Sequence, residues 1–387
     1  MTQNPGEPEP VAYLDNAATT PVRQVAIDAM VPMMSKCFAN PSGAHRMARE
    51  ARRALDDARD VLAPGLGCEP GDIVFTAGGT EADNLAIIGA YQRHGGTVVC
   101  PAAEHHAVLH AVEHCGGTIV ATDNHGRVDL AALAEILTPE VTLVSVMLVN
   151  NESGVVQSLD PVADLIAENA PNALLHTDAV QAFPWIDVAT AAARADMISI
   201  SAHKFGGPKG VGALVIREGV DIAPQLIGGG QERDRRSGTQ NVPGIVAMAA
   251  AAQEMLATRD ETVARIAAQR DRLVDGLVDA VDGMIETAVV NGDRSQKVAG
   301  SCHICVQGVE SEALLVLLER ENIFGSAASS CSSGAQDPSH VLAAMGMERS
   351  MAAGSLRLSL GFATTDAEID HALAVIPGVF DRLKMFG

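Results

Sequence analysis

The sequence predicts an α/β protein with a large, mostly parallel sheet covered by helices, followed by a smaller α+β unit. Three observations predict this class. From residue 13 to about residue 257, short apolar runs alternate with longer helical patterns. The apolar runs are nearly continuous, as expected for parallel strands that are buried on both faces. The chain has 387 residues, which is more than one core usually supports, so a second unit is expected.

Seven apolar runs in the first part of the chain are predicted as strands. They are residues 73–76, 97–100, 118–121, 143–149, 173–176, 197–201 and 212–216. Helical patterns such as 81–92 and 161–168 separate several of these runs. A long Ala-rich stretch over 247–281 is predicted as a helix that leads to the second unit.

The C-terminal part of the chain mixes strands and helices in a different order. Its pattern predicts a strand at 301–306, a helix at 311–321, a Ser/Gly/Ala-rich loop at 325–336, a strand at 355–359 and a last helix at 366–383. We therefore expect a flexible tail over residues 1–12, a large domain over 13–258 and a small C-terminal domain over 259–387.

Composition and charge exclude several classes of protein. The formal net charge of −21 argues against nucleic-acid binding, because phosphates attract Lys and Arg. No run of about 18 apolar residues occurs, and the polar, acidic start lacks the pattern of a signal peptide. We therefore expect no membrane span. Seven cysteines, an odd number, without an export signal predict a reducing cytoplasm.

Polar residues follow five of the predicted strands at the points where these strands end. Ligands of open α/β sheets bind beyond the carboxyl ends of the strands, so these residues are expected to line one crevice. They are Gly79 and Thr80, Glu104 and His105, Asn150 and Asn151, Asp178 and Gln181, and finally Ser201, His203 and Lys204. Taken alone, Thr80 with Asp83 also fits a helix cap, and one lysine at a strand end also fits a side chain reaching solvent.

Together these residues match the requirements of pyridoxal 5′-phosphate. Lysine shifts its pKa readily on burial and is the usual residue that forms a Schiff base. A carboxylate such as Asp178 would keep the pyridine nitrogen protonated, and a glycine turn at a helix start would bind the phosphate. No metal ion is expected. Cys302 and Cys305 have the spacing of half a zinc site, but no second cysteine pair follows them.

Short motifs along nearly the whole chain carry a family resemblance. They are residues 13–21, 79–81, 104–106, 149–152, 178 with 181, Ser201-Ala202-His203-Lys204, 236–239, Ser330-Cys331-Ser332-Ser333-Gly334 with 338–342, and 356–361. In this order they resemble the cysteine desulfurase family, which lies within the class V branch of the fold-type I pyridoxal-phosphate enzymes. The resemblance runs from residue 13 to beyond residue 360.

The resemblance implies a set of contacts around the cofactor ring. Lys204 would form the Schiff base with the cofactor, and Asp178 would pair with the pyridine nitrogen. Gln181 would contact the ring hydroxyl. His105 would lie over the ring face and share in proton transfer.

The resemblance also implies residues for the phosphate and for the substrate. The phosphate would be held by Gly79, Thr80, Ser201 and His203. Thr239 would reach the phosphate bound by the neighbouring subunit, which implies a homodimer. Asn151 and Arg357 would orient the substrate, with the guanidinium gripping its carboxylate.

Cys331 determines the reaction that the resemblance implies. L-cysteine would be the substrate, and Cys331 would take its sulfur as a persulfide while L-alanine leaves. The sulfur would then pass to an acceptor or scaffold protein, for example in iron–sulfur cluster assembly. A thiolate is an effective nucleophile, although the local sequence alone also fits an incidental loop cysteine.

Other activities remain open on the same fold. A selenocysteine lyase would use the same chemistry with selenium, and a class V aminotransferase would leave Cys331 unexplained. A non-catalytic binding protein is disfavoured because the lysine, the carboxylate, the histidine, the arginine and the cysteine are all present. Two residues depart from the family pattern, since Ala202 and Ala328 stand where relatives usually have Gly.

Overall fold

The main sheet of the protein has seven strands. The computed structural model describes residues 10–282, 288–328 and 339–384. The strands are β2 (Ile73–Thr76), β3 (Thr97–Pro101), β4 (Thr118–Val120), β5 (Val141–Ser145), β6 (Leu174–Asp178), β7 (Met197–Ser201) and β8 (Gly212–Ile216). Their spatial order is β2-β8-β7-β6-β5-β3-β4. Only β8 runs antiparallel to its neighbours, so the other six strands end at one edge of this sheet.

All seven predicted strands form, and the predicted fold class is confirmed. The largest difference concerns the fourth strand, which was predicted over 143–149 and spans Val141–Ser145. Val146 and Leu148 still donate backbone hydrogen bonds to the carbonyls of His176 and Asp178, at 3.0 and 2.9 Å. These residues are buried, so the apolar run continues past the end of the strand.

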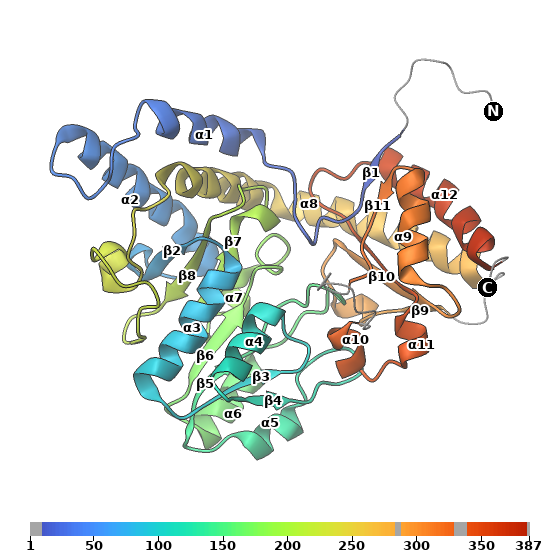
Figure 1. Cartoon of the computed structure of the whole chain (residues 1–387), viewed down its shortest axis with the longest axis horizontal. Coiled ribbons are helices and arrows are strands. Elements are labelled where there is room, and N and C mark those ends of the chain that lie inside the picture. Colours follow the sequence, from blue (N-terminus) through green and yellow to red (C-terminus); the bar gives the residue numbers. More distant parts are fainter. Residues whose placement is uncertain (1–9, 283–287, 329–338, 385–387) are drawn as a thin grey trace.

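Helices cover both faces of the main sheet, as Figure 1 shows. One face packs against α3 (Gly79–His94) and α4 (His106–His114); the other packs against α2 (Arg46–Leu66), α5 (Leu130–Ile136), α6 (Asp160–Asn169) and α8 (Val242–Asp282). Successive residues of β8 show why its sequence is continuously apolar. Ala213 and Val215 belong to the core under α2, α6 and α8, whereas Leu214 belongs to the core under α3 and α4.

Shorter elements complete the first part of the chain. They are α1 (Gln24–Ser35), α7 (Val188–Ala191), and the 3-10 turns η1 (Pro70–Asp72), η2 (Ala202–Lys204) and η3 (Gln231–Asp234). None of the helices in the described ranges is long and apolar enough to cross a membrane.

A second hydrophobic core lies around a three-stranded antiparallel sheet with the order β12-β10-β9. The C-terminal part of the chain forms β9 (Ala288–Val290), η4 (Arg294–Gln296), β10 (Ser301–Val306), α9 (Ser311–Arg320), α10 (His340–Ala344), α11 (Arg349–Ala352), β12 (Ser355–Ser359) and α12 (Asp366–Lys384). Helices α10 and α11 pack in a separate small cluster with Ala103 and Cys305. The start of the chain joins this core, because β1 (Ala12–Tyr13) pairs in parallel with β11 (Ile323–Phe324). Ala12 and Leu14 are fully buried there.

Helix α8 connects the two cores and packs on α1, α2 and α12 (Figure 1). Its residues Ile245 and Met248 lie in the first core, and Ile266 and Leu273 lie in the second. Trp185 packs against both cores. The domain boundary near residue 258 stays a prediction.

A buried ion pair fixes the loop that follows the main sheet. Arg59 on α2 donates from Nη2 to both carboxylate oxygens of Glu232 at 2.8 Å, and its guanidinium lies 4.5 Å from the centre of the Phe75 ring. Glu232 also accepts the backbone N–H of Phe75 at 2.9 Å and the side-chain amide of Gln240 at 3.2 Å. The two ionic side chains are only 12% and 1% exposed.

We predict that Arg59→Met lowers the free energy of unfolding by about 3 kcal/mol, because it leaves the Glu232 carboxylate buried without its cation. Denaturant unfolding of the cofactor-free protein measures the change. The matched control is Arg46→Met, since Arg46 pairs with Glu50 at 3.7 Å with both side chains largely exposed. Its effect should stay below about 1 kcal/mol. Equal losses for the two variants would contradict the prediction.

Candidate active site

Lys204 lies where β7 runs directly into η2, at the carboxyl edge of the main sheet. Its Nζ donates to the backbone carbonyls of Ala17 at 2.5 Å and Ala18 at 2.9 Å. Burial lowers the pKa of Lys204 to about 8, with a further contribution from the nearby Arg357 guanidinium. The amine is therefore held at a fixed position and can lose its proton near neutral pH.

Asp178 is the last residue of β6 and is 4% exposed. Its Oδ1 accepts the backbone N–H of Val180 at 2.8 Å. Burial raises the pKa of Asp178 to about 6, while that hydrogen bond and the charge of Lys204 oppose the rise. Between pH 6 and pH 8 the site therefore holds an anionic Asp178 and a cationic Lys204.

His105 and Gln181 add a neutral ring and an amide to the site. His105 caps the start of α4, and its Nδ1 accepts the backbone N–H of Ala107 at 3.1 Å. Burial, with a smaller effect of Lys204, lowers the pKa of His105 to about 4, so the ring is neutral at physiological pH. Because Nδ1 is an acceptor, the ring proton is on Nε2. Gln181 donates to the Ala17 carbonyl at 2.8 Å.

The start of α3 forms a second part of the site. The helix begins at Gly79 after Gly78 (φ 152°), and no side chain caps it, so the helix-cap interpretation of Thr80 and Asp83 is wrong. A Cβ on Gly79 would lie only 2.8 Å from Val180 Cγ2, so glycine lets the Val180 side chain pack closely against the main chain here. The first amides of a helix have no intrahelical partner and favour an anion. Nearby, His203 Nδ1 lies 3.2 Å from Thr19 Oγ1.

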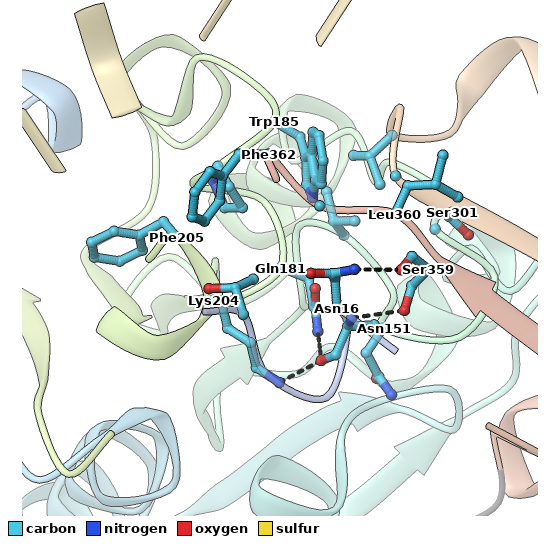
Figure 2. A pocket seen from close by; sticks show the side chains of 18 of the residues that line it. Asn16, Asn151, Gln181, Trp185, Lys204, Phe205, Ser301, Ser359, Leu360 and Phe362 are labelled. Carbon is cyan, nitrogen blue, oxygen red and sulfur yellow. Dashed lines mark hydrogen bonds between the residues drawn. The ribbon is translucent and has the colours of Figure 1, made fainter. Parts of the chain in front are cut away.

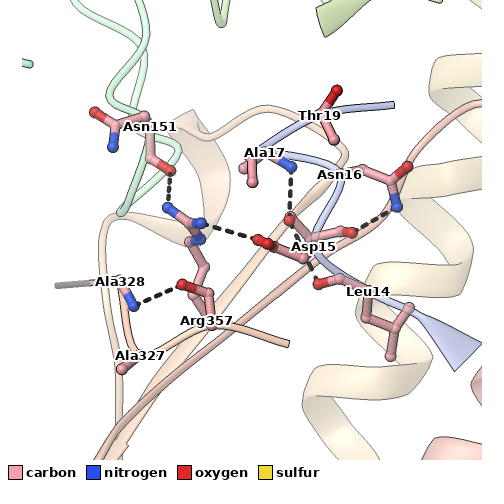
Figure 3. A network of polar contacts seen from close by, with 12 residues as sticks. Leu14, Asp15, Asn16, Ala17, Thr19, Asn151, Ala327, Ala328 and Arg357 are labelled. Carbon is pink, nitrogen blue, oxygen red and sulfur yellow. Dashed lines mark hydrogen bonds and ion pairs between the residues drawn. The ribbon is translucent and has the colours of Figure 1, made fainter. Parts of the chain in front are cut away.

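Arg357 reaches the site from β12, a strand of the second core (Figure 3). Its Nη2 lies 3.0 Å from Asp15 Oδ1, and its Nη1 donates to the Asn151 carbonyl at 3.3 Å. Arg357 Nε and Asn151 Oδ1 are buried and have no hydrogen-bond partner among the described residues. The guanidinium is thus oriented by two contacts, whereas its Nε is left unpaired.

These groups line one cavity of about 390 Å³. The structure brings the following predicted residues together around it: Gly79, Thr80, His105, Asn151, Asp178, Gln181, Ser201, His203, Lys204 and Arg357. Thr239 is exposed and lies outside this lining, on a loop joined to α3 by the Arg236–Glu81 ion pair at 2.7 Å. Cys331 lies outside the described residues, and Ala328 and His340, on either side of the undescribed segment, both line the cavity.

A smaller cavity of about 40 Å³ shares Lys204, Gln181 and Asn151 with the larger one and extends to Trp185 and Phe362 (Figure 2). Asn16 and Ala17 connect Lys204 and Gln181 to β12. Asn16 Nδ2 donates to the Ser359 carbonyl at 2.9 Å, and Ala17 N–H donates to Ser359 Oγ at 2.8 Å. The second core therefore holds in place the Ala17 carbonyl, which accepts a hydrogen bond from the Lys204 amine.

Some residues of the site were not assigned a role from the sequence. Asp15 belongs to the motif over residues 13–21, but the motif gave no reason to pair it with Arg357. Asp83 lines the cavity with its side chain buried. Ala328 has φ of +64°, a conformation that favours glycine, which explains why glycine is usual at this position. Ala202 shows no such strain and packs in the first core.

Comparison with known proteins shows to which family this chain belongs. The aminotransferase class-V family model matches residues 12–372. The chain is 39% identical to the cysteine desulfurase IscS of Methanosarcina thermophila, over 96% of this chain and 92% of that protein. It is 41% identical to an IscS-like cysteine desulfurase of Mycobacterium tuberculosis, over 97% of both chains.

Solved structures agree with these relatives. A NifS-like protein superposes with a TM-score of 0.89 at 32% identity, covering 96% of this chain and all of that one. SspA in complex with cysteine superposes with a TM-score of 0.77 at 30% identity, covering 92% of this chain and all of that one. The chain belongs to the class-V aminotransferase family. Within that family, the relatives from Methanosarcina thermophila and Mycobacterium tuberculosis are named cysteine desulfurases.

We predict that the Lys204 amine of the cofactor-free protein reacts with an amine-specific reagent at a half-maximal rate near pH 8, because burial makes its neutral form accessible at lower pH than in an ordinary lysine. Peptide mass spectrometry after timed labelling measures the rate, and the other lysines in the same digest provide the comparison. Asp178→Asn should move the midpoint below pH 8, because the Asp178 charge favours the ammonium form. A midpoint near pH 10 in the wild-type protein would refute the assignment.

Proposed function

We propose that this chain is a pyridoxal 5′-phosphate-dependent cysteine desulfurase that converts L-cysteine to L-alanine and carries the sulfur as a persulfide on Cys331. One observation carries the proposal. A single cavity holds Lys204, Asp178, His105 and Arg357 in a chain whose curated relatives are named cysteine desulfurases.

The residues of the cavity fit pyridoxal phosphate. The free amides at the start of α3, which begins at Gly79, suit a phosphate, which Thr80, Ser201 and His203 would also hold. Asp178 would pair with the ring nitrogen, Gln181 would contact the ring hydroxyl, and the amine of Lys204 would bind the aldehyde carbon. When bound, the cofactor supplies an electron sink for negative charge at the α-carbon of an amino acid.

The protein's own residues would bind the substrate and move its protons. Arg357 would use its unpartnered Nε to grip the carboxylate of L-cysteine, with Asp15 holding the guanidinium and Asn151 orienting the substrate. Lys204 Nζ, with a pKa of about 8, can accept and return a proton near neutral pH. His105 is neutral and carries its hydrogen on Nε2, so it can donate a hydrogen bond beside the ring.

Cys331 would be the sulfur acceptor. Its thiolate would bond to the substrate sulfur as the carbon–sulfur bond breaks, which leaves a persulfide on the protein and L-alanine as the second product. The described residues on both sides of its segment line the cavity, which supports this role. A solved relative at 30% identity is a complex with cysteine. Delivery of the sulfur to an acceptor or scaffold protein, such as one of iron–sulfur cluster assembly, belongs to the same proposal.

We also propose a homodimer in the cytoplasm. The side of the site at Gly78, Thr80 and His203 opens into a broad surface hollow, and Thr239 is exposed on a nearby loop, so a second copy could complete the phosphate site. Ile227 is 90% exposed on the same loop system, whose Leu226 carbonyl accepts the Ser237 N–H at 3.1 Å. The six cysteines of the described segments are free thiols, in keeping with a reducing compartment.

We predict that Cys331→Ala binds cofactor and L-cysteine normally but loses at least about 99% of alanine release, because no thiolate remains to take the sulfur. Alanine and sulfide are measured after adding L-cysteine with and without a reductant. Cys37→Ala, which removes a partly exposed thiol elsewhere in the chain, is the control and should keep full activity. Undiminished alanine release by Cys331→Ala would refute the role.

The same assay separates the alternative activities. Turnover of L-selenocysteine at unchanged rate by the Cys331→Ala variant, with little turnover of L-cysteine by wild-type protein, would favour a selenocysteine lyase. Steady formation of pyruvate together with an aminated cofactor, which transamination of the alanine product would give, would favour an aminotransferase.

We predict that the wild-type protein is a dimer by light scattering and that Ile227→Asp shifts it toward the monomer, because a charge would replace an exposed apolar side chain at the subunit contact. The variant should also bind pyridoxal phosphate at least about tenfold more weakly, since Thr239 of the partner would be lost. Val316→Asp, a 51% exposed position on α9, is the control and should remain dimeric. A wild-type monomer with full cofactor affinity would overturn the homodimer.

A further inference from the structure

A second carboxyl group lies beside Asp178 in the site. Asp83, in the early part of α3, lines the same cavity and is 1% exposed, compared with 4% for Asp178. Its Oδ1 is buried and has no hydrogen-bond donor among the described residues. The charge of Asp178 is the largest effect of any charged group on Asp83. The two buried carboxyl groups therefore line the same cavity.

The histidine nearest to Asp83 supplies no positive charge. His176 on β6 lies between two hydroxyl groups, with Nδ1 at 2.8 Å from Ser145 Oγ and Nε2 at 2.9 Å from Ser199 Oγ. Its Nε2 is 3.7 Å from Asp83 Oδ1, which is beyond hydrogen-bond distance. Burial lowers the pKa of His176 to about 3, so the ring is neutral.

The other elements packed against α3 do not compensate a negative charge on Asp83 either. Strands β2, β5, β7 and β8 carry no titratable side chain. Strand β3 carries Cys100, and the segment after it carries Glu104, a third buried carboxyl group whose Oε1 accepts the Met147 N–H at 2.5 Å. Lys204 donates its hydrogen bonds to Ala17 and Ala18. Helix α4 carries His106, His110, Glu113 and His114.

Two neighbouring buried carboxyl groups cannot both ionise when no cation is in contact with the second one. Burial, followed by the charges of Asp178 and Glu104, raises the pKa of Asp83 well above its usual range, against a hydrogen bond from Ser199. The pair therefore loses its first proton near the pKa of Asp178, about 6, and keeps the second proton at neutral pH.

We propose that Asp83 is a positioning residue for Asp178: a carboxyl group that stays neutral, shares its proton with the Asp178 carboxylate and so leaves a single, oriented negative charge at the base of the site. The consequence for the cofactor rests on the function proposed above. There, Asp178 would face the ring nitrogen as the sole anion of the pair, and Asp83 would fix its direction.

Unfolding of the cofactor-free protein at a series of pH values tests whether Asp83 holds a proton. The unfolded chain releases the Asp83 proton above about pH 4, whereas the folded protein retains it, so Asp83 makes the wild-type protein less stable as the pH rises. Asp83→Asn has nearly the same shape and needs no proton. Its unfolding equilibrium constant relative to wild type should therefore fall by up to about tenfold per pH unit between pH 6 and pH 9.

The control for this experiment is Asp57→Asn, which changes an exposed carboxyl group of α2 in the same way. Its effect on unfolding should not vary with pH in this range. If the effect of Asp83→Asn is equally independent of pH, Asp83 is ionised in the folded protein and the proposal is overturned.

Cofactor affinity tests the action of Asp83 on Asp178. Titration with pyridoxal phosphate, followed by absorbance, should give a dissociation constant for Asp83→Asn within about threefold of wild type, because the amide is neutral and still donates a hydrogen bond. Asp83→Ala should bind at least about tenfold more weakly. Equal weakening of both variants, or of neither, would sink the positioning role.

The two measurements also separate this proposal from the proposed function. If the wild-type protein binds no pyridoxal phosphate, the proposed function and the positioning role fail together, but the unfolding data still decide whether Asp83 is neutral. If wild-type binding is tight and the Asp83→Asn unfolding difference is independent of pH, only the present inference fails.

Discussion

Burial of charged groups at one edge of the main sheet is the constraint on which the site depends. Burial disfavours the charged forms of the Lys204 amine and of the Asp178 carboxyl group. The charge of each group favours the charged form of the other. Their pKa values, about 8 and about 6, consequently lie on either side of neutral pH. The backbone carbonyls of Ala17 and Ala18 fix the amine without adding a full charge.

The cavity exists only where the two cores meet. Asp178 and Lys204 come from strands of the first core, whereas Arg357 comes from β12 of the second. The segment around Asn16 links the two cores. It donates hydrogen bonds to Ser359 on one side, and on the other its Ala17 carbonyl accepts a hydrogen bond from the Lys204 amine. Helix α8 contributes to both cores and so sets their spacing. A shift between the units would separate Arg357 from the rest of the site.

Much of the fold could be predicted because its signal is local. Most strands of the main sheet are buried on both faces, so their sequences are short apolar runs. Strand β7 was predicted with the bounds that it has in the structure. The short strands β1 and β11 could not be predicted in this way. They contain two residues each, and their pairing joins Ala12 to Ile323, a contact that no local pattern reports. The end of β5 was misjudged because burial continues beyond the strand.

The sequence by itself determined the class of fold and the chemical groups of the site, because strand ends in an open α/β sheet converge and Lys204, Asp178 and His105 each follow a strand. The tertiary structure decided the rest. The pairing of Asp15 with Arg357 joins residues 342 positions apart, and the cavity that Asp83 and Asp178 both line brings a helix to a strand end. Such contacts depend on how the elements pack, and the resulting pKa values depend on the water that packing excludes, which no sequence motif specifies.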